Sequence, residues 1–585
     1  MKKFWLFISV LIISFIFFGC QAGDSGASKE NIAKWNQEKD WKAEVGDWLM
    51  LRLSSDPPTL NPVVASDTSS SAINSKIYDS LMEISDDLKL IPNLVEAFEV
   101  SPDGLVFTFH LKDGLKWNDG KPLTTKDVKF TYDVIMDPQN QANNKRAGYE
   151  NVRKFEVVDK LTFKVHYAEP FAPALLKWTM TVIPEHIFKK DALNHTLKSS
   201  SHNINPVGNG PFILESWQEN KKVVLKANDK YFRGRPYFDK VIYRIIPEQA
   251  VVFQMMQIGQ IDNSIITPQQ YELAKQKPDV GDKIFSIYDV KEYYAPSYTY
   301  VGWNMTGQNP FFTDKKVRQA MTYAIDRQSI VKNLLFGHAE LISGPFYLKS
   351  WAYNHDVKPI PFDDKKAEKL LDEAGWELGK DGIREKNGIK FEFELLVPSS
   401  SSTGKKVAAF MQASYKKLGI IMNIKQLEWS TFLKKTYDTT QFTAYLAGWS
   451  LGLDHDPYAI WHSSQTETGL NKIGYRNTEV DKLIEKGRRE MDLGKRSKLY
   501  NKVHELIADD QPYLFLYIRT DIETVHKRIK NTVFYPYGWY NMTNVGFPDA
   551  AEGLFDKFLM NGYKWDFKSY KGAFVPKELQ LYPGE

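Results

Sequence analysis

Cysteine is almost absent from this chain, because Cys20 is the only one in 585 residues. No disulfide can form within the chain, so the folded protein has to be stabilised by its core alone. The sequence also lacks any apolar run after residue 18 that is long enough to cross a bilayer. It lacks the H-E-x-x-H pattern of zinc proteases, and we expect neither a metal site nor a cofactor.

A large net charge is missing as well. The formal charge is +4, and it falls to +2 if residues 1–19 are removed, because two lysines lie there. A nearly neutral chain gives no electrostatic reason to expect binding to nucleic acid. With 43% hydrophobic residues the composition is that of a globular protein, and the length suggests roughly two to four domains.

The N-terminus reads as an export leader. Two lysines precede the apolar residues 4–18, and a glycine stands directly before Cys20. This order is typical of a secretory signal and resembles bacterial lipoproteins, in which the cysteine thiol carries a diacylglycerol. We predict a signal peptide over residues 1–19, lipidation of Cys20 and a tether over residues 20–44. The chain would be exported and lipid-anchored, on the periplasmic side of a membrane or the outer face of the cell membrane. The alternative is a buried structural cysteine behind an uncleaved anchor.

Residues 103–138 combine a strand, a turn and a helix. Apolar side chains alternate over residues 105–111, as they do on one face of a strand. Thr124 and Asp127 have the spacing of a capping box at a helix start, and the proline after Asp137 ends that helix. The segment predicts an α+β module.

Strands and helices alternate in the second half of the chain. Residues 391–397, 420–427 and 442–447 have strand patterns, and helical patterns separate them. This β-α-β-α-β order predicts an α/β fold with parallel strands and right-handed crossovers. Ligands bind at the carboxyl ends of such strands, so the loop over residues 448–457 is the predicted site region.

The same loop contains G-x-S-x-G, the pattern around the nucleophile of serine hydrolases, with Ser450 at its centre. His462, His504 and His526 follow in the order that a catalytic triad would need. However, the pattern requires a helix directly after the serine, whereas glycine, aspartate and proline follow here. An oxyanion loop of the HGGG type is also absent. We therefore predict no catalytic residue and keep hydrolysis by Ser450 as a distant alternative.

Aromatic residues are plentiful, with 15 tryptophans and 30 tyrosines. Such side chains make good cleft walls, because each offers an apolar face and many also offer a polar tip. An exported, tethered protein with an aromatic cleft is suited to the capture of a nutrient.

Several segments between residues 51 and 517 resemble those of one protein family. They are Pro58-Thr59-Leu60-Asn61-Pro62, residues 103–138, Gly208-Asn209-Gly210-Pro211-Phe212 with Trp217, residues 231–236, residues 311–327, Glu373-Ala374-Gly375-Trp376, and residues 474–484. In these segments the chain resembles the extracytoplasmic solute-binding proteins of peptide ABC transporters, the oligopeptide- and dipeptide-binding group called family 5.

The resemblance implies a two-lobed fold of the periplasmic-binding-protein type, hinged around a cleft and without enzymatic activity. The expected parts are lobe one over residues 45–302 with an inserted subdomain at about 75–205, lobe two over 303–520, and a return to lobe one over 521–585. Hinges would fall near residues 300–304 and 516–520. The implied partners are a peptide ligand and the membrane permease subunits of an ABC transporter, with the protein itself a monomer.

The resemblance also implies ligand contacts. In peptide-binding relatives, a Gly-Trp pair followed by an aspartate places an indole against the ligand and a carboxylate on its α-ammonium. Trp449 matches the indole, and either Asp454 or Asp456 could supply the carboxylate. The predicted ligand-binding set is completed at the expected hinge by Tyr300, Trp303 and Asn304. Relatives of this fold carry sugars or nickel complexes, so oligosaccharide or another small solute is the alternative to peptide.

Overall fold

The computed structural model describes residues 46–84, 90–452, 454–467 and 469–529, together with the short strands β22 (Val533–Phe534) and β23 (Tyr540–Asn541). The predicted signal peptide, Cys20 and the tether lie outside these residues. Within the described ranges, no helix combines the length and the apolar character that crossing a bilayer requires.

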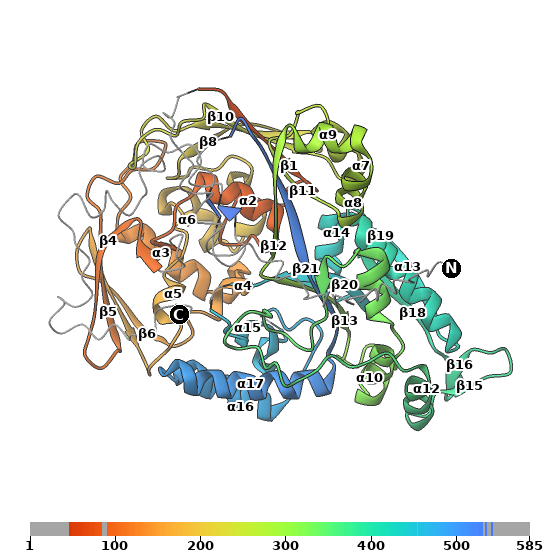
Figure 1. Ribbon diagram of the computed structural model, residues 1–585. Coiled ribbons are helices and arrows are strands. Elements are labelled where there is room, and N and C mark those ends of the chain that lie inside the picture. Colours follow the sequence, from red (N-terminus) through yellow and green to blue (C-terminus); the bar gives the residue numbers. More distant parts are fainter. Residues whose placement is uncertain are drawn as a thin grey trace, which may run out of the picture.

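A 12-stranded mixed sheet is the largest sheet formed by the described residues, and β21 lies at its centre (Figure 1). From one edge to the other its main path is β19 (Ile421–Leu427), β18 (Glu392–Pro398), β20 (Ala444–Ser450), β13 (Ser297–Trp303), β21 (Tyr513–His526), β11 (Asn263–Ile266), β1 (Trp48–Leu53), β10 (Lys240–Ile245), β9 (Lys222–Ala227) and β8 (Phe212–Gln218). Two further strands, β12 (Tyr288–Tyr294) and β14 (Ala339–Glu340), pair with β21.

The 14-residue strand β21 connects the two halves of this sheet. Its first part, up to Tyr517, pairs with β13, and its second part pairs with β12 and β11. We propose that the two lobes meet here, with β13 and β18–β20 in lobe two and β1 and β8–β12 in lobe one. The boundary expected between residues 520 and 521 therefore falls inside one continuous strand.

Lobe two has the predicted β-α-β-α-β order. Strand β18 pairs in parallel with β19 and with β20, and α13 (Ser402–Lys417) crosses between β18 and β19. Helices α10 (Lys315–Tyr323) and α12 (Asp364–Glu373) pack with α13 on one face of the sheet. Gly375 follows the end of α12 with a φ of +80°, the left-handed conformation that glycine adopts most readily at helix ends. The carboxyl ends of β18, β19 and β20 consequently lie at one edge.

Lobe one carries a four-stranded sheet of its own. Its order is β4 (Val95–Val100), β5 (Val106–Leu111), β7 (Thr162–Tyr167) and β6 (Val152–Val157). Helices α3 (Thr125–Met136) and α6 (Glu185–Leu193) lie beside it. The predicted capping box is confirmed. The Thr124 side chain accepts a backbone N–H of the first turn, and the Asp127 carboxylate accepts the backbone N–H of Thr124 at 2.9 Å. We refer to residues 75–205, as expected from the sequence, as the inserted subdomain.

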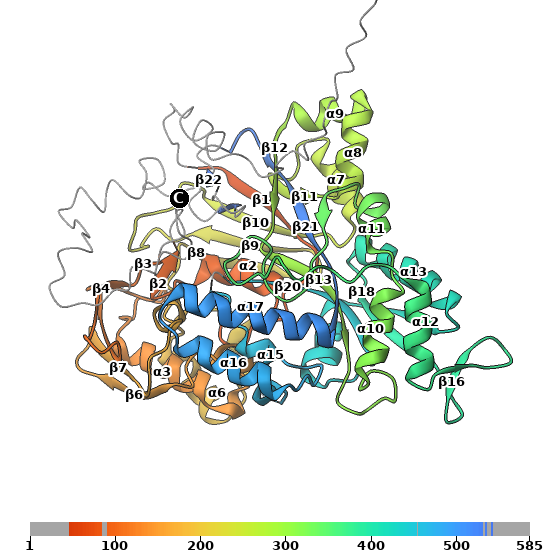
Figure 2. The same cartoon turned by 60° about the horizontal axis from the view of Figure 1, so that its bottom comes forward.

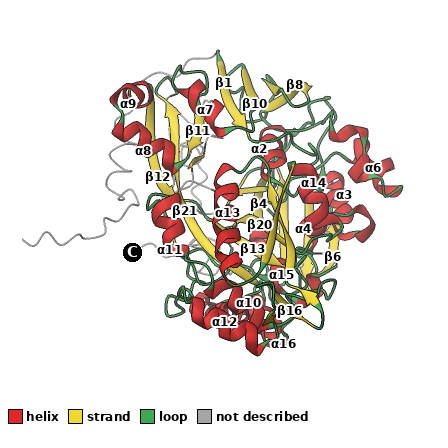
Figure 3. Ribbon diagram, turned by 90° about the vertical axis from the view of Figure 1, so that its right-hand side faces the viewer, coloured by secondary structure: helices red, strands yellow, loops and turns green. Residues whose placement is uncertain are grey.

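Helices cover both faces of the main sheet (Figure 3). In lobe one, α2 (Thr68–Ile77) packs on one face, and α7 (Gln249–Met256), α8 (Pro268–Gln276) and α9 (Pro278–Phe285) form a separate core on the other. In lobe two, α16 (Thr478–Arg489) and α17 (Leu493–Asp510) pack opposite α10, α12 and α13. Figure 2 shows α16 and α17 beside the inserted subdomain.

A buried histidine in the core of lobe two makes stability depend on pH. The His504 ring accepts the N–H of Asn354 through Nδ1 at 3.2 Å, so its Nε2–H donates to the Ser343 hydroxyl at 2.9 Å. Burial lowers the pKa of His504 to about 3. Below pH 6.5 the imidazole of residue 504 is therefore protonated in the unfolded chain but stays neutral in the folded protein. The free energy of unfolding consequently falls as the pH decreases toward 3.

We expect this histidine alone to remove about 2 kcal/mol of unfolding free energy between pH 8 and pH 5. Chemical denaturation of the wild type and of His504→Gln at both pH values measures the effect. The variant should show a pH dependence that is smaller by this amount, whatever its absolute stability. An identical pH dependence in the two proteins would contradict the assignment.

Candidate functional site

Three aromatic rings from three neighbouring strands stack at the carboxyl end of β20. The ring planes of Trp449 and Tyr300 differ by 8°, with centroids 6.3 Å apart, and Tyr300 in turn stacks on Tyr513 at 3.9 Å. The indole N–H of Trp449 donates to the Tyr513 hydroxyl at 3.3 Å. Trp449 is half-buried whereas Tyr300 and Tyr513 have no exposed surface. The indole of Trp449 is therefore the accessible ring of the stack, and the two buried tyrosine rings fix its position.

Tyr437 forms the second accessible ring of this cluster. It lies in η5 (Lys434–Asp438) with its ring edge-on to Trp449, at a centroid distance of 5.7 Å. Its hydroxyl is 3.1 Å from that of Tyr300, which is also within 3.3 Å of the Tyr445 hydroxyl. Burial raises the pKa of Tyr437, so the phenol stays neutral and can donate a hydrogen bond. The cluster offers apolar faces with a few hydroxyl groups.

Ser450 lies in the last position of β20, with its residue exposed, and no helix follows it directly. The next helix, α15 (Tyr458–Trp461), begins only after the loop and has four residues. Two of the three histidines are engaged elsewhere, since His504 binds Ser343 and His462 lies beside Ser464. The strand-to-helix turn that exposes a hydrolase nucleophile is thus not formed around Ser450.

Asp454 forms a bidentate ion pair with Arg496 of α17. The two carboxylate oxygens accept from the guanidinium at 2.8 and 3.1 Å, and both side chains are 7% exposed. Burial disfavours the charged form of Asp454, but the guanidinium outweighs it and holds the pKa of the carboxyl below its usual value. The carboxylate proposed for a ligand ammonium therefore already has a full cationic partner inside the protein.

Asp456 is also paired within the protein. Its Oδ2 lies 3.3 Å from Nε of Arg488 on α16 and 3.7 Å from Nζ of Lys177 in the inserted subdomain. Its other oxygen accepts the N–H of Tyr458 at 3.2 Å, and the side chain is 5% exposed. Asp456 thus connects α16 with the inserted subdomain through its two ion pairs.

Trp303 and Asn304, which belong to the predicted ligand-binding set, lie away from the aromatic stack. Trp303 is fully buried against Phe312 at 4.6 Å, in the core beneath the opposite face of the sheet. The physical reason is the strand period: Tyr300 and Trp303 are three positions apart in β13 and point to opposite faces. Asn304 is fully buried and donates to the Phe442 carbonyl at 2.8 Å.

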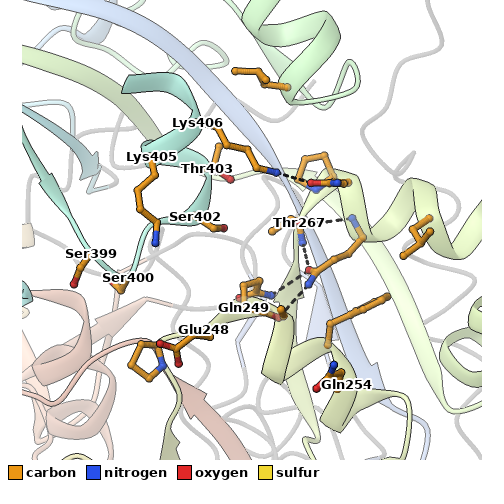
Figure 4. Close-up of a pocket in the computed structure, with 18 of the residues that line it drawn as sticks. Glu248, Gln249, Gln254, Thr267, Ser399, Ser400, Ser402, Thr403, Lys405 and Lys406 are labelled. Carbon is orange, nitrogen blue, oxygen red and sulfur yellow. Dashed lines mark hydrogen bonds between the residues drawn. The ribbon is translucent and has the colours of Figure 1, made fainter. Parts of the chain in front are cut away.

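A groove of about 560 Å³ separates the two lobes beside the carboxyl end of β18 (Figure 4). One wall is the β18–α13 turn with the first turn of α13, and the other consists of the N-terminal parts of α7 and α8. Lys406 reaches across to the amide oxygen of Gln269 at 2.5 Å. The lining is rich in hydroxyl and amide groups, with Lys405 on one wall and Glu248 on the other. Such a lining can satisfy both donors and acceptors of a polar main chain.

Sequence reasoning missed Tyr437, Tyr513, Arg488 and Arg496. A signal existed for Arg496, because it stands at the helical spacing of the buried residues Tyr500, Val503 and Ile507. A charged residue at a core position of a helix needs a buried partner. For Tyr513 the sequence holds no such signal, since its contact with Tyr300 arises only when β21 pairs with β13.

Arg488 fastens the inserted subdomain to lobe two. Its Nη2 donates to the Ala147 carbonyl at 2.5 Å, and its guanidinium carbon lies 4.7 Å from the ring centre of Phe171 and 3.9 Å from that of Tyr458. The residue is 5% exposed. We expect Arg488→Met to favour a more open arrangement of the lobes and to weaken ligand binding by about tenfold or more.

Small-angle X-ray scattering without ligand should show a larger radius of gyration for Arg488→Met, and calorimetry should show the weaker binding. Arg489→Met is the matched control, because Arg489 is half-exposed and its 2.6 Å pair with Glu169 is worth little. Equal effects of the two variants would contradict a special role for Arg488.

Comparison with known proteins adds to this geometry. The family model described as bacterial extracellular solute-binding proteins, family 5 middle, matches residues 89–471. The chain is 32% identical to the oligopeptide-binding protein AppA of Bacillus subtilis over 542 residues, which are 92% of this chain and 97% of that protein. The solved structure of Bacillus subtilis AppA in complex with a nonapeptide superposes with a TM-score of 0.80 at 31% identity, covering 86% and 99% of the two chains. NikZ of Campylobacter jejuni, solved with Ni(L-His), has a TM-score of 0.71 at 25% identity and coverages of 84% and 95%.

Proposed function

Because the chain belongs to family 5 of the bacterial extracellular solute-binding proteins, we propose that it captures peptides outside the cytoplasm and delivers them to an ABC importer. It would do so as a monomer that binds its ligand between the two lobes. The single observation that carries this proposal is the 0.80 TM-score with a relative that was solved holding a nonapeptide.

The geometry of the cleft supports a peptide ligand. The inter-lobe groove provides hydroxyl and amide groups from Ser399, Ser400, Gln249 and Gln254, which can both donate and accept hydrogen bonds. A peptide main chain has the same alternation of N–H and C=O groups. Trp449 and Tyr437 do not line this groove. We propose that they supply apolar faces for side chains at the carboxyl end of β20, the strand that pairs with β18. Ligand selection would rest on main-chain hydrogen bonds with permissive side-chain contacts.

The proposed anchor for the α-ammonium needs revision. Asp454 and Asp456 each have a cationic partner from the protein, so neither is proposed as an unpaired ammonium anchor. Their proposed role is to hold the loop after β20 in the shape that presents Trp449. Peptides with free and with acetylated N-termini should then lose affinity equally in Asp454→Asn.

Calorimetry with synthetic peptides of two to nine residues tests the assignment, together with native mass spectrometry of whatever co-purifies. Peptide binding with a co-purifying peptide mass supports the proposal. Binding of oligosaccharides without binding of any peptide would contradict the proposal. It would favour the alternative of an oligosaccharide-binding protein, in which the accessible indole of Trp449 stacks on a sugar ring.

We further propose that Cys20 is lipidated and tethers the protein to the cell envelope. The thiol is the only cysteine in the chain, so Cys20→Ser removes the only site of this kind of acylation. The expected result is loss of fatty-acid labelling and release of the protein from the membrane fraction, or accumulation of unprocessed precursor. Ser450→Ala, carried through the same fractionation, should behave as the wild type. Unchanged labelling of Cys20→Ser would refute the anchor.

A further inference from the structure

A histidine at the junction of the two lobes is attached to the strand that connects them. His338 directly precedes β14, and its backbone carbonyl accepts the N–H of Thr520 in β21 at 3.0 Å. β14 pairs with β21 at Ile518 and Arg519, between the part of β21 that pairs with β13 and the part that pairs with β12. His338 therefore belongs to the segment of lobe two that lies nearest to the crossing between the lobes.

The side chain of His338 contacts two acidic residues of lobe one. Its Nδ1 lies 3.1 Å from Oε2 of Glu292 on β12, and its Nε2 lies 3.4 Å from Oε1 of Glu272 on α8. The ring is edge-on to Tyr271 of α8, with centroids 5.6 Å apart, and the side chain of His338 is 13% exposed. The ring thus connects lobe two with a strand and a helix of lobe one.

Both ring nitrogens of His338 face carboxylate oxygens, and this geometry requires a protonated ring. A neutral imidazole has one N–H and one lone pair, so it donates to one carboxylate and turns its lone pair toward the other. The imidazolium donates to both. The hydrogen bond with Glu292, assisted by the one with Glu272, raises the pKa of His338 above its ordinary value although burial opposes this. Both contacts are therefore present at low pH and are lost as the pH rises through the raised pKa.

The other ionisable groups around the ring have partners of their own. The pairs are Lys275 with Glu272 on α8, Glu340 of β14 with the Tyr294 hydroxyl, and Arg519 with Asp521 on β21. Burial raises the pKa of Tyr271, so this phenol stays neutral. Glu292 depends most on His338, whose hydrogen bond is the main reason that the pKa of this carboxyl lies below its usual value. Deprotonation of the ring consequently weakens the contact with β12 most.

Helix α8 also forms a wall of the groove between the lobes. Its residues from Pro268 to Gln270 and Leu273 line the groove, as does Leu334, which lies four residues before His338. A contact that holds α8 against lobe two therefore limits how far the groove can open.

We propose that His338, Glu272 and Glu292 form a proton-dependent latch, which holds the two lobes together when the imidazole is protonated and releases them when it is neutral. The latch rests on the two-lobed arrangement of the proposed function, but not on the identity of the ligand. A ligand that requires closed lobes then binds more tightly in acidic than in alkaline surroundings, because the latch stabilises the closed arrangement before the ligand arrives.

Small-angle X-ray scattering of the full chain without ligand, at pH 6 and pH 9, tests the latch. The wild type should have the larger radius of gyration at pH 9, since losing charge-assisted hydrogen bonds lowers the ratio of closed to open molecules by about tenfold or more. His338→Asn should have the larger radius at both pH values. His186→Asn is the matched control, because His186 pairs with Asp119 within lobe one at 2.7 Å, and this variant should respond to pH as the wild type does.

Nuclear magnetic resonance of protein with labelled histidine follows the titration of the ring itself, and the spectrum of His338→Asn identifies its signals. We expect a pKa above the ordinary 6.5 that falls in Glu272→Gln/Glu292→Gln, and the radius of that double variant should not change with pH. The latch is refuted by a wild-type radius that does not change with pH, by an equal change in His338→Asn, or by a pKa of His338 at or below 6.5. Failure to bind any peptide would leave these results unaffected and would count only against the proposed function.

Discussion

Arg496→Met is expected to lower the unfolding free energy of lobe two by about 3–5 kcal/mol, because it leaves Asp454 as an unpaired buried carboxylate. The pair is bidentate and its two side chains are only 7% exposed, so water cannot replace the guanidinium. Arg496 also stacks 5.1 Å from the rings of Trp351 and Tyr500, and methionine retains part of that apolar contact. The loss of unfolding free energy should therefore come mainly from the unpaired negative charge of Asp454.

Denaturant unfolding followed by far-UV circular dichroism measures this loss, and Asp454→Asn/Arg496→Met is its control. The double variant removes both charges and should recover most of the stability, since the coupling between the two residues accounts for the effect. Additive losses would show that the residues act independently, which the geometry of the pair contradicts. If Arg496→Met were as stable as the wild type, the prediction would be wrong, because the Asp454 carboxylate would not depend on Arg496 for its stabilisation.

Trp449→Ala is expected to weaken peptide binding by about 2–4 kcal/mol, which is roughly thirtyfold to a thousandfold. The indole is the accessible outer ring of a stack whose inner members, Tyr300 and Tyr513, are fully buried. A rigid aromatic side chain loses little conformational entropy when it contacts a ligand. Removing it also exposes the face of Tyr300 to water.

Calorimetry of the purified variants with one peptide measures this effect. Trp449→Phe keeps an aromatic face and should retain most of the affinity, although it loses the hydrogen bond to Tyr513. Ser450→Ala changes the neighbouring exposed residue and should bind as the wild type does. Full affinity in Trp449→Ala would remove the indole from the proposed ligand contacts.

Local features of this fold were predictable from the sequence, whereas contacts between distant segments were not. The capping box at Thr124, the helix end at Gly375 and the parallel strands of lobe two follow from spacings within a few residues. The partner of Asp454 lies on a different element, and several residues could have filled that role until the packing was known. Strand order predicted the site region after a strand over residues 442–447 and placed Trp449 in the loop that follows, whereas β20 continues to Ser450 and includes Trp449.

The alternation of side chains along a strand is a local rule that would have improved the prediction of the site. Tyr300 was placed near the ligand, and it does support Trp449, but from a fully buried position. Trp303 was placed with it because both lie at the expected hinge near residues 300–304. The period of two along β13 sends their side chains to opposite faces, and that rule was available from the sequence once the strand was assigned.

The place of β21 in the chain has a consequence for folding during synthesis. Residues 513–526 emerge after nearly all the other strands, yet they complete the pairing of β11 and β13 and supply the whole pairing of β12. Until they leave the ribosome, the nascent chain carries open strand edges in both lobes, which are templates for association with other chains. We therefore expect the growing polypeptide to depend on chaperones until its last long strand is made, and we expect a chain that terminates before Tyr513 to aggregate instead of folding one lobe.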